Sequence, residues 1–169
     1  EVWIRGGVYA EALTMVSNVA VYGGFSGTES ARSERDPATH PTVVDASLSR
    51  TGSIGKRVVT MTNVAGARLD GLILFGGLAN DVTPEDRGGG ILCQGAGAGN
   101  VLANLVVAGN KATSGGGLAI VSSASPRVEN CVIVDNTAVY GAGVWSSSAS
   151  PVLVNNTIAS NTSTFQGGG

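Results

Sequence analysis

A nine-residue phrase that ends in Asn recurs through the C-terminal half of the chain. It occupies residues 102–110, 128–136 and 153–161, so that its starts lie 26 and 25 residues apart. Glycine clusters punctuate the same stretch, at 88–90, 115–117, 141–143 and 167–169, with Gly-Ala-Gly in the third. A repeat of this period is typical of a solenoid, in which each copy forms one coil that stacks on the next.

Two weaker copies of the phrase, at 16–24 and 69–77, extend the repeat toward the N-terminus. All five copies have an aliphatic residue at the sixth position, which we expect to form one column in the core. The column consists of Val21, Leu74, Val107, Ile133 and Ile158. The third position is Asn or Gly throughout, as Asn18, Gly71, Asn104, Asn130 and Asn155.

The Asn and Gly positions predict bends in the backbone. The first, fourth and sixth positions are read as inward-facing, and strict alternation along a strand cannot place all three on one side. The chain must therefore bend at the third position, where Asn and Gly tolerate a positive φ. The closing Asn of each late phrase fits a second bend, and its stacked amides would hydrogen-bond along the column. These residues are Asn110, Asn136 and Asn161.

The composition favours strands and turns over helices. Apolar residues make up 43 % of the chain, charged residues only 13 %, and 26 of 169 residues are Gly. Such a chain is too apolar to be disordered. The net charge of −2, without a basic stripe, argues against nucleic acid as a partner. No apolar run is long enough to cross a bilayer.

One β-helix domain over 1–169 is expected, with regular coils at 88–169. The opening coils, 1–77, contain a polar loop at 25–41, and a second insertion spans 78–87. We expect the first loop to cover one side or end of the solenoid through Arg–carboxylate pairs, and a functional loop is the alternative. The chain begins at Glu1 without Met and ends inside a repeat, which indicates a portion of a longer protein.

Few residues in the sequence suggest chemistry. The ionisable residues of the regular coils fall in different columns and predict no stacked pair of acids, and His40 has no identifiable partner for a role as base. We therefore expect no catalytic residue and no cofactor. Calcium is a weaker alternative, with Asp81, Glu85 and Asp86 as its ligands against a solvated loop. Cys93 and Cys131 favour two buried thiols, with a disulfide as the alternative.

The outward columns are unusually apolar, which predicts an interaction surface. Its members are Leu92, Ala119, Trp145, Val106, Val132, Tyr140 and Phe165. Cover by loops or by a neighbouring domain is the alternative. Trp145 and Tyr140 would also suit stacking on sugar rings.

The two repeated motifs resemble those of right-handed parallel β-helix proteins of the pectin-lyase-like superfamily, in the branch with polymorphic-outer-membrane-protein-type repeats. The glycine motif stands at 89–91, 116–118 and 142–144, and the second motif at 107–110, 133–136 and 158–161. Here Val or Ile replaces the aromatic residue of that second motif. The resemblance implies an all-β, right-handed, single-stranded parallel β-helix with about 25–26 residues per coil. It also implies an extracellular or cell-surface setting, and no single activity.

These observations together predict a structural or adhesive solenoid that contacts copies of itself or other surface components, as a fibre or stalk. The alternative is a β-helix that binds or cleaves polysaccharide. Ice binding is a weaker third reading, because the Thr residues do not keep to one column.

Overall fold

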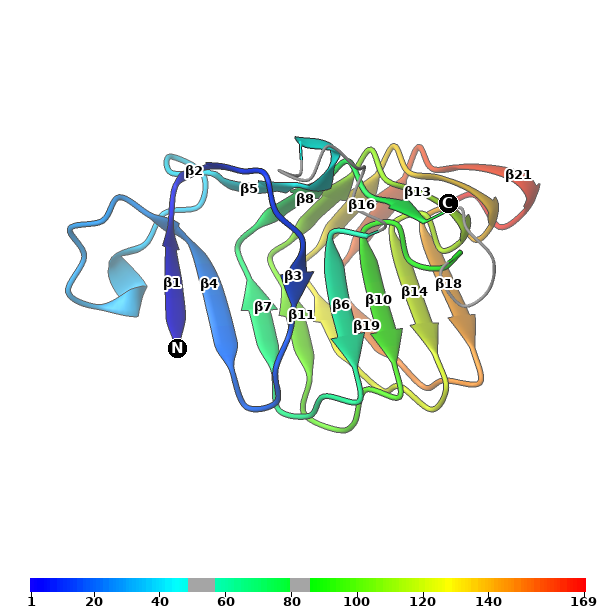
Figure 1. The fold of residues 1–169 in the computed structure, drawn as a ribbon, viewed down its shortest axis with the longest axis horizontal. Coiled ribbons are helices and arrows are strands. Elements are labelled where there is room, and N and C mark those ends of the chain that lie inside the picture. Colours follow the sequence, from blue (N-terminus) through cyan, green and yellow to red (C-terminus); the bar gives the residue numbers. More distant parts are fainter. Residues whose placement is uncertain (49–56, 80–85) are drawn as a thin grey trace.

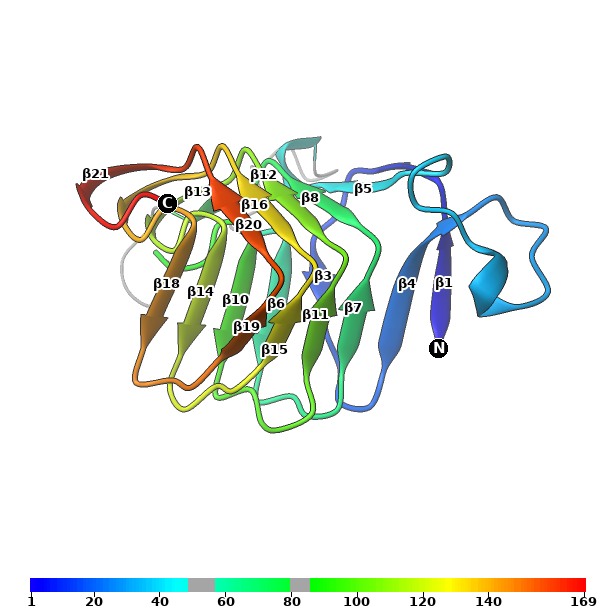
Figure 2. The ribbon, with the colours of Figure 1, turned by 180° about the vertical axis from the view of Figure 1, so that it is seen from behind.

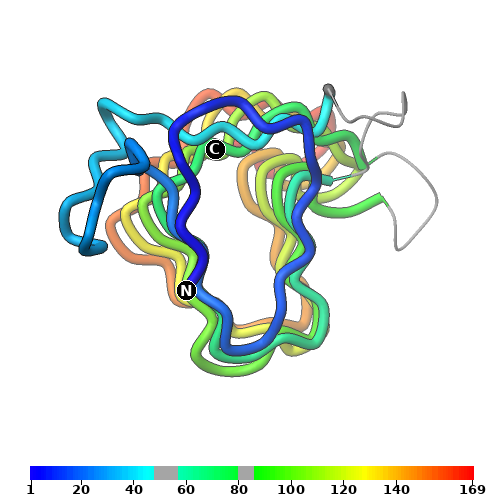
Figure 3. Tube along the Cα trace, turned by 60° about the vertical axis from the view of Figure 1, so that its left-hand side comes forward, coloured from blue at the N-terminus to red at the C-terminus, as the bar shows by residue number. Residues whose placement is uncertain are grey.

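The chain winds into successive coils whose short strands pair with those of the coils before and after (Figure 1). The computed structural model describes residues 1–48, 57–79 and 86–169. Every strand pairing among these residues is parallel, and the strands form four sheets that run along the solenoid. The fold is the parallel β-helix that the resemblance implies, right-handed as crossovers between parallel strands are. In Figure 3 the coils superimpose around one interior.

We name the four sheets A to D; a regular coil passes through them in the order A, B, D and C, whereas the first coil has strands in A, B and C only. Sheet A contains β1 (Val2–Arg5), β4 (Ala20–Phe25), β7 (Arg68–Asp70), β11 (Val101–Ala103), β15 (Arg127–Glu129) and β19 (Val152–Val154). Sheet B contains β2 (Gly7–Tyr9), β5 (Thr42–Asp45), β8 (Ile73–Phe75), β12 (Val106–Ala108), β16 (Val132–Val134) and β20 (Thr157–Ala159).

Sheets C and D complete the coil. Sheet C contains β3 (Leu13–Thr14), β6 (Val59–Thr62), β10 (Ile91–Gln94), β14 (Leu118–Val121) and β18 (Val144–Ser147). Sheet D contains β9 (Leu78–Ala79), β13 (Lys111–Ser114), β17 (Thr137–Tyr140) and β21 (Thr162–Gln166). Short 3-10 turns occur at Arg32–Glu34 and Ala46–Leu48. Within the described ranges, no helix is long and apolar enough to cross a membrane.

The aliphatic core is stacked in columns, one layer per coil. In sheet B, Leu74, Val107, Ile133 and Ile158 are paired in register, as the sequence predicts. The first three are at most 1 % exposed. A second column in sheet A contains Leu69, Leu102, Val128 and Leu153. Neighbouring strands lie about 4.8 Å apart, so each layer packs directly on the next.

Val21 is the exception to the predicted core column. It pairs with Leu69 and therefore belongs to sheet A, whereas Val44 of β5 occupies the place beside Leu74. The chain bends at Gly24, which has φ of 95°, before the 25–41 loop separates β4 from β5. Because of this loop, the first copy of the phrase does not have the spacing of the later copies. An alignment by residue type therefore places Val21 in sheet B, although it lies in sheet A.

The bends at the third position divide into two sets. Gly71, Asn104, Asn130 and Asn155 have φ between 51° and 73° and turn the chain from sheet A to sheet B. Asn18 also has a positive φ, 61°, but its N–H donates to the Ala65 carbonyl at the turn from sheet C to sheet A. Asn18 is thus not a member of the predicted turn column.

The closing Asn residues do not themselves form the second bend. The residue before each of them has the positive φ: Gly109 (65°), Asp135 (54°) and Ser160 (57°). Asn110, Asn136 and Asn161 instead point inward, are at most 7 % exposed and hydrogen-bond to one another along the column. The amide stack is therefore present, while the bend lies one residue earlier.

This amide stack explains the glycine clusters. A Cβ on Gly117 would lie 2.9 Å from the Asn136 Nδ2 and 2.6 Å from the Gly143 carbonyl oxygen. Gly90 and Gly143 meet Asn110 and Asn161 in the same way, at 3.0 and 2.8 Å from Nδ2. Gly is required because a neighbouring amide and a neighbouring backbone already fill the space of a side chain.

Candidate functional site

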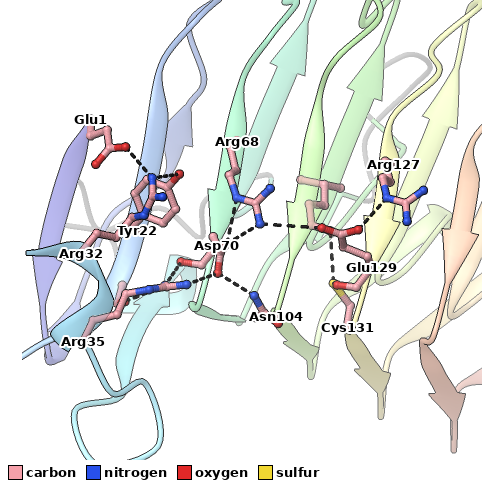
Figure 4. Close-up of polar contacts among 12 residues, drawn as sticks. Glu1, Tyr22, Arg32, Arg35, Arg68, Asp70, Asn104, Arg127, Glu129 and Cys131 are labelled. Carbon is pink, nitrogen blue, oxygen red and sulfur yellow. Dashed lines mark hydrogen bonds and ion pairs between the residues drawn. The ribbon is translucent and has the colours of Figure 1, made fainter.

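A cluster of polar side chains lies on the outer face of sheet A (Figure 4). Tyr22 of β4 and Arg68 and Asp70 of β7 point outward from this sheet, because their neighbours in the strands face the core. Arg32 and Arg35 reach the same place from the loop between β4 and β5. With Asn104 these side chains line a polar groove of about 450 Å³.

Asp70 is the centre of the cluster and is only 2 % exposed. Its Oδ1 accepts from Arg35 Nη2 at 2.6 Å and from Asn104 Nδ2 at 2.8 Å, and its Oδ2 accepts from Arg68 Nε at 2.9 Å. Burial alone would raise the pKa of Asp70, but the hydrogen bonds from Asn104, Arg35 and Arg68 outweigh it and hold the pKa below its usual range. Asp70 is therefore a fixed anion at neutral pH.

The loop is tied to the solenoid through its two arginines. Arg35 Nη1 also donates to the Gly23 and Asp70 carbonyls, at 3.1 and 3.3 Å. The Arg32 guanidinium lies 4.8 Å above the Tyr22 ring and bonds to the Tyr22 hydroxyl at 2.9 Å and to Glu1 at 2.6 Å. These contacts attach the loop to the side of sheet A, where Figure 2 shows it beside β1 and β4.

The loop is also ordered from within by its own carboxylates. Hydrogen bonds from the backbone N–H groups of Ser26, Gly27 and Thr28 occupy both oxygens of Glu29. Led by the bond from Ser26, these bonds lower the pKa of Glu29 to about 2 despite the opposing desolvation. These internal hydrogen bonds fix the conformation of the loop at residues 26–29.

Asp70 and Glu129 form a column of acids that the sequence reasoning missed. They occupy the same outward position two coils apart, with Ala103 between them. Arg68 Nη2 contacts both carboxylates, at 2.7 and 3.7 Å, and Arg127 Nε contacts Glu129 at 2.6 Å. The signal was present as Arg-Leu-Asp at 68–70 and Arg-Val-Glu at 127–129, each with its charges on the outward side of a strand.

This acid column does not have the chemistry of a glycosidase. Such an enzyme needs one carboxyl that stays protonated to act as general acid, together with a second that stays ionised. Asp70 is buried and held ionised by two guanidinium groups, so it can neither donate a proton nor reach a substrate. The geometry is that of an ion-pair network that locks the loop to the coils.

Two members of the predicted interaction surface are not exposed. Leu92 and Ala119 point away from the main core but are 2 % and 0 % exposed, in a second small cluster with Val121 and the half-buried Trp145. The Arg87 guanidinium lies 5.2 Å from the Trp145 ring centroid. Alternation along a strand distinguishes the two faces of a sheet, but it does not reveal whether another segment covers the outer face.

The other members remain at the surface. In the outward column of sheet B, Val106 is half-buried and Val132 is 37 % exposed. Tyr140 and Phe165 are 38 % and 69 % exposed, and their rings meet edge to face with centroids 5.5 Å apart. The apolar surface is therefore narrower than the sequence predicts, and its aromatic part lies on sheet D.

No group of three potential metal ligands occurs within residues 1–48, 57–79 and 86–169. Of the calcium candidates, Asp81 and Glu85 lie outside the described residues. Asp86 is described: its carboxylate is 3.7 Å from Arg87 Nε, and its carbonyl accepts from the N–H groups of Thr113 and Ser114.

Both cysteines are buried and neither is bonded to the other. Burial raises the pKa of the Cys93 thiol to about 12 and that of the Cys131 thiol to about 11. Cys93 Sγ packs 3.8 Å from Met61 Sδ inside the core. These thiols are packing groups rather than nucleophiles.

The C-terminal coil differs from the others in its lack of charged residues. No Asp, Glu, Lys, Arg or His occurs from residue 136 to 169. This stretch supplies β17 to β21, and β18, β19, β20 and β21 are each the terminal strand of a sheet. Val152, Leu153 and Val154 are 50 %, 40 % and 38 % exposed, whereas Val128 in the preceding coil is 1 % exposed.

Comparison with known families agrees with this geometry. A family model described as a right-handed beta helix region matches residues 49–169. Comparison with curated proteins and with solved structures gives no match.

Proposed function

Since the chain belongs to the right-handed β-helix family, we propose that it is a structural solenoid outside the cell, one that associates end to end with further copies of itself. The observation that carries the proposal is the regular coil, whose aliphatic and amide columns repeat in register and whose residues 136–169 include no Asp, Glu, Lys, Arg or His. Soluble proteins usually protect exposed strand edges with charges, Pro or a covering segment, because a bare edge is a template for another chain.

The backbone of this edge is available for pairing. Val152 donates its N–H back to Pro126, and Thr157 donates back to Cys131. Since successive backbone groups alternate across a strand, the N–H and C=O groups of Leu153 and Ile158 point to the open edge. Another parallel strand placed there would continue sheets A and B without disturbing an existing bond.

The side chains of the edge also favour a further layer. Leu153 faces the interior of the coil and is 40 % exposed in the 169-residue chain, whereas Leu102 of the same column is 0 % exposed. One more coil would bury this residue to the same degree. Complete burial of an exposed aliphatic side chain contributes about 2 kcal/mol.

The first coil of a second copy is the occupant that we propose. Its edge strands β1, β2 and β3 belong to sheets A, B and C, and its Val2 is 47 % exposed. Stacking the last coil of one copy on the first coil of the next keeps all strands parallel. Such a contact joins two different surfaces, so it repeats and gives an open filament rather than a closed dimer.

Sedimentation velocity of the 169-residue chain, from low micromolar to near-millimolar concentration, tests the proposal. The weight-average mass should rise with concentration. Leu153→Lys places a charge inside the edge and should give a monomer. Val154→Lys, on the same strand with its side chain outward, is the matched control and should still associate. A parent chain that is monomeric throughout, or variants that behave alike while keeping the parent circular dichroism, would contradict the proposal.

The proposed location is tested separately. Antibodies raised against the chain should label intact cells of its source under the electron microscope, without permeabilisation. Labelling that requires permeabilised cells would overturn the extracellular part of the proposal and leave the end-to-end contact standing.

A second candidate function is carbohydrate binding, which the Tyr140–Phe165 pair favours. Two exposed aromatic rings that meet edge to face, on paired strands of successive coils, offer a surface on which sugar rings stack. Tyr140→Ala together with Phe165→Ala should abolish retention of the chain on an immobilised neutral or acidic polysaccharide. Release of unsaturated uronides, followed by their absorbance, would indicate lyase activity in addition to binding.

A further inference from the structure

A second groove, of about 380 Å³, lies at the N-terminal corner of the solenoid. It is bounded by β1 and β2 on one side and by the two ends of the 25–41 loop on the other. Val8 and Val43 from the outward column of sheet B form part of its wall, so it opens on the side of the solenoid rather than at the coil edge. Grooves of this volume suit a small molecule or a single amino acid residue.

Arg5 gives this groove a positive charge that no acid in the lining neutralises. Arg5 and His40 line it, and no Asp or Glu does, although acidic residues outnumber Lys and Arg by 12 to 10 in the chain. Among the described residues, the Arg5 guanidinium forms no hydrogen bond or ion pair, whereas Arg32 and Arg35 are both paired. A guanidinium with free donors is suited to a carboxylate, which it binds through two parallel hydrogen bonds.

The nearest carboxylates are already engaged. Asp36 accepts the backbone N–H groups of Ala38 and Thr39 on its Oδ1, at 2.9 and 3.3 Å. Glu29 lies beside Arg5 in a separate, smaller cleft of about 150 Å³, and backbone N–H groups hold both its oxygens. Neither acid is within ion-pair distance of Arg5, so its donors remain open to a ligand.

The walls of the groove are held in place by the fold. The Arg5 carbonyl accepts from the Tyr9 hydroxyl at 2.9 Å and from the Thr42 hydroxyl at 3.3 Å. Gly6 N–H donates to the Phe25 carbonyl at 2.7 Å, and Gly7 N–H donates to the Pro41 carbonyl at 2.9 Å. Because both strands and both loop ends are bonded to each other, the groove exists before any ligand arrives, and this lowers the entropic cost of binding.

The rest of the lining is apolar. Val8 is 66 % exposed, and Phe25 is buried with its ring stacked on Trp3 at 4.7 Å between centroids. We propose that this groove binds a carboxylate carried on a small apolar body, with the carboxylate on Arg5 and His40 and the body against Val8, Val43 and Phe25. The carboxylate would come from a free organic acid or from the C-terminal residue of a peptide. This inference is independent of the end-to-end contact, which uses the coil edge.

Isothermal titration with 3-phenylpropanoate tests the proposal, and 3-phenylpropanamide is the neutral probe of the same shape. The acid should bind saturably and the amide should not. Arg5→Gln should weaken binding by at least about tenfold, as expected for the loss of a charged hydrogen-bond pair. Arg127→Gln removes an exposed arginine elsewhere on the surface and should leave binding unchanged.

A second pair of probes distinguishes the two sources of the carboxylate. A tripeptide that ends in Phe, compared with its C-terminal amide, should bind more tightly than 3-phenylpropanoate if peptide ends are the natural ligand, and more weakly if free acids are. Acid and amide that bind alike, no saturable binding of any acid, or equal effects of the Arg5 and Arg127 variants would each overturn the proposal.

Discussion

Replacing Asn136 by Ala should destabilise the solenoid more than any comparable change at its surface. The Asn136 side chain is 0 % exposed and uses all of its hydrogen-bonding capacity. Its Oδ1 accepts from the N–H and the Nδ2 of Asn110, both at 3.0 Å. Its Nδ2 donates to the Val107 carbonyl at 2.9 Å and to Asn161 Oδ1 at 3.0 Å.

The size of the effect follows from the groups that the change leaves behind. Asn136→Ala leaves the N–H of Asn110 without an acceptor in the interior, and an unsatisfied buried group costs about 1–3 kcal/mol. It also removes the side-chain bond to the Val107 carbonyl, which keeps its place in the ladder between β12 and β16. The column also loses its link between Asn110 and Asn161. We expect the free energy of unfolding to fall by about 4 kcal/mol, a large part of the stability of an ordinary domain.

Asn130, six residues earlier in the same coil, is the matched control. It is exposed, and its side chain accepts one bond, from Asn155 at 2.7 Å. Asn130→Ala should cost about 1 kcal/mol, mainly because Ala tolerates the φ of 55° less well than Asn does. Urea unfolding followed by circular dichroism measures both. If Asn136→Ala proved no more destabilising than Asn130→Ala, the buried amide column would not be the element that holds the coils together.

Three further outcomes follow from the structure. Gly117→Ala should cost about 3 kcal/mol in a urea titration, because its Cβ would meet the Gly143 carbonyl oxygen at 2.6 Å. Gly97→Ala is the control and should cost less than about 1 kcal/mol, because its nearest neighbours are Ala65 Cβ at 3.3 Å and the Val64 carbonyl oxygen at 3.8 Å; equal effects would argue against the close packing of glycine clusters. Asp70→Asn should lower the free energy of unfolding by about 2 kcal/mol at pH 7, because it removes the ion pairs to Arg35 and Arg68. Since folding lowers the pKa of Asp70, this difference from the parent should be constant above about pH 4 and shrink as the pH falls further, which thermal unfolding over that range measures. A difference that grows on acidification would be inconsistent with the ion pairs. Cys93 and Cys131 should resist a thiol reagent at pH 8 in the folded chain, because both are buried and burial raises the pKa of both thiols. Both should react once the chain is unfolded in urea. Rapid labelling of the folded chain would place them nearer the surface.

The sequence predicts the regular coils well because their period is constant. Between Leu102 and Leu153 each coil adds 25 or 26 residues, so the same residue types recur at the same place, and the columns through Val107 and Ile133 follow from the alignment. Where a loop interrupts the coil, the copies of the repeat can no longer be aligned by counting residues. Val21 and Asn18 were misplaced for this reason, since the 25–41 loop separates two strands that are adjacent in every later coil.

The surface was harder to predict than the core, for two physical reasons. Alternation places Leu92 and Ala119 outside the central core correctly, but their burial depends on contacts that a strand pattern does not encode. The ion pair between Arg35 and Asp70 joins residues 35 positions apart, from a loop and a strand, and only the folded chain brings them together. The groove at Arg5 was missed for the same reason, because its walls come from three separate segments.

Methyl–methyl nuclear Overhauser effects in the 169-residue chain are the most direct measure of the coil stack. Neighbouring layers lie about 4.8 Å apart. The account predicts cross-peaks that link Leu74 to Val107, Val107 to Ile133 and Ile133 to Ile158, in that order along the axis. A spectrum in which the Val107 methyls contact neither Leu74 nor Ile133 would contradict it.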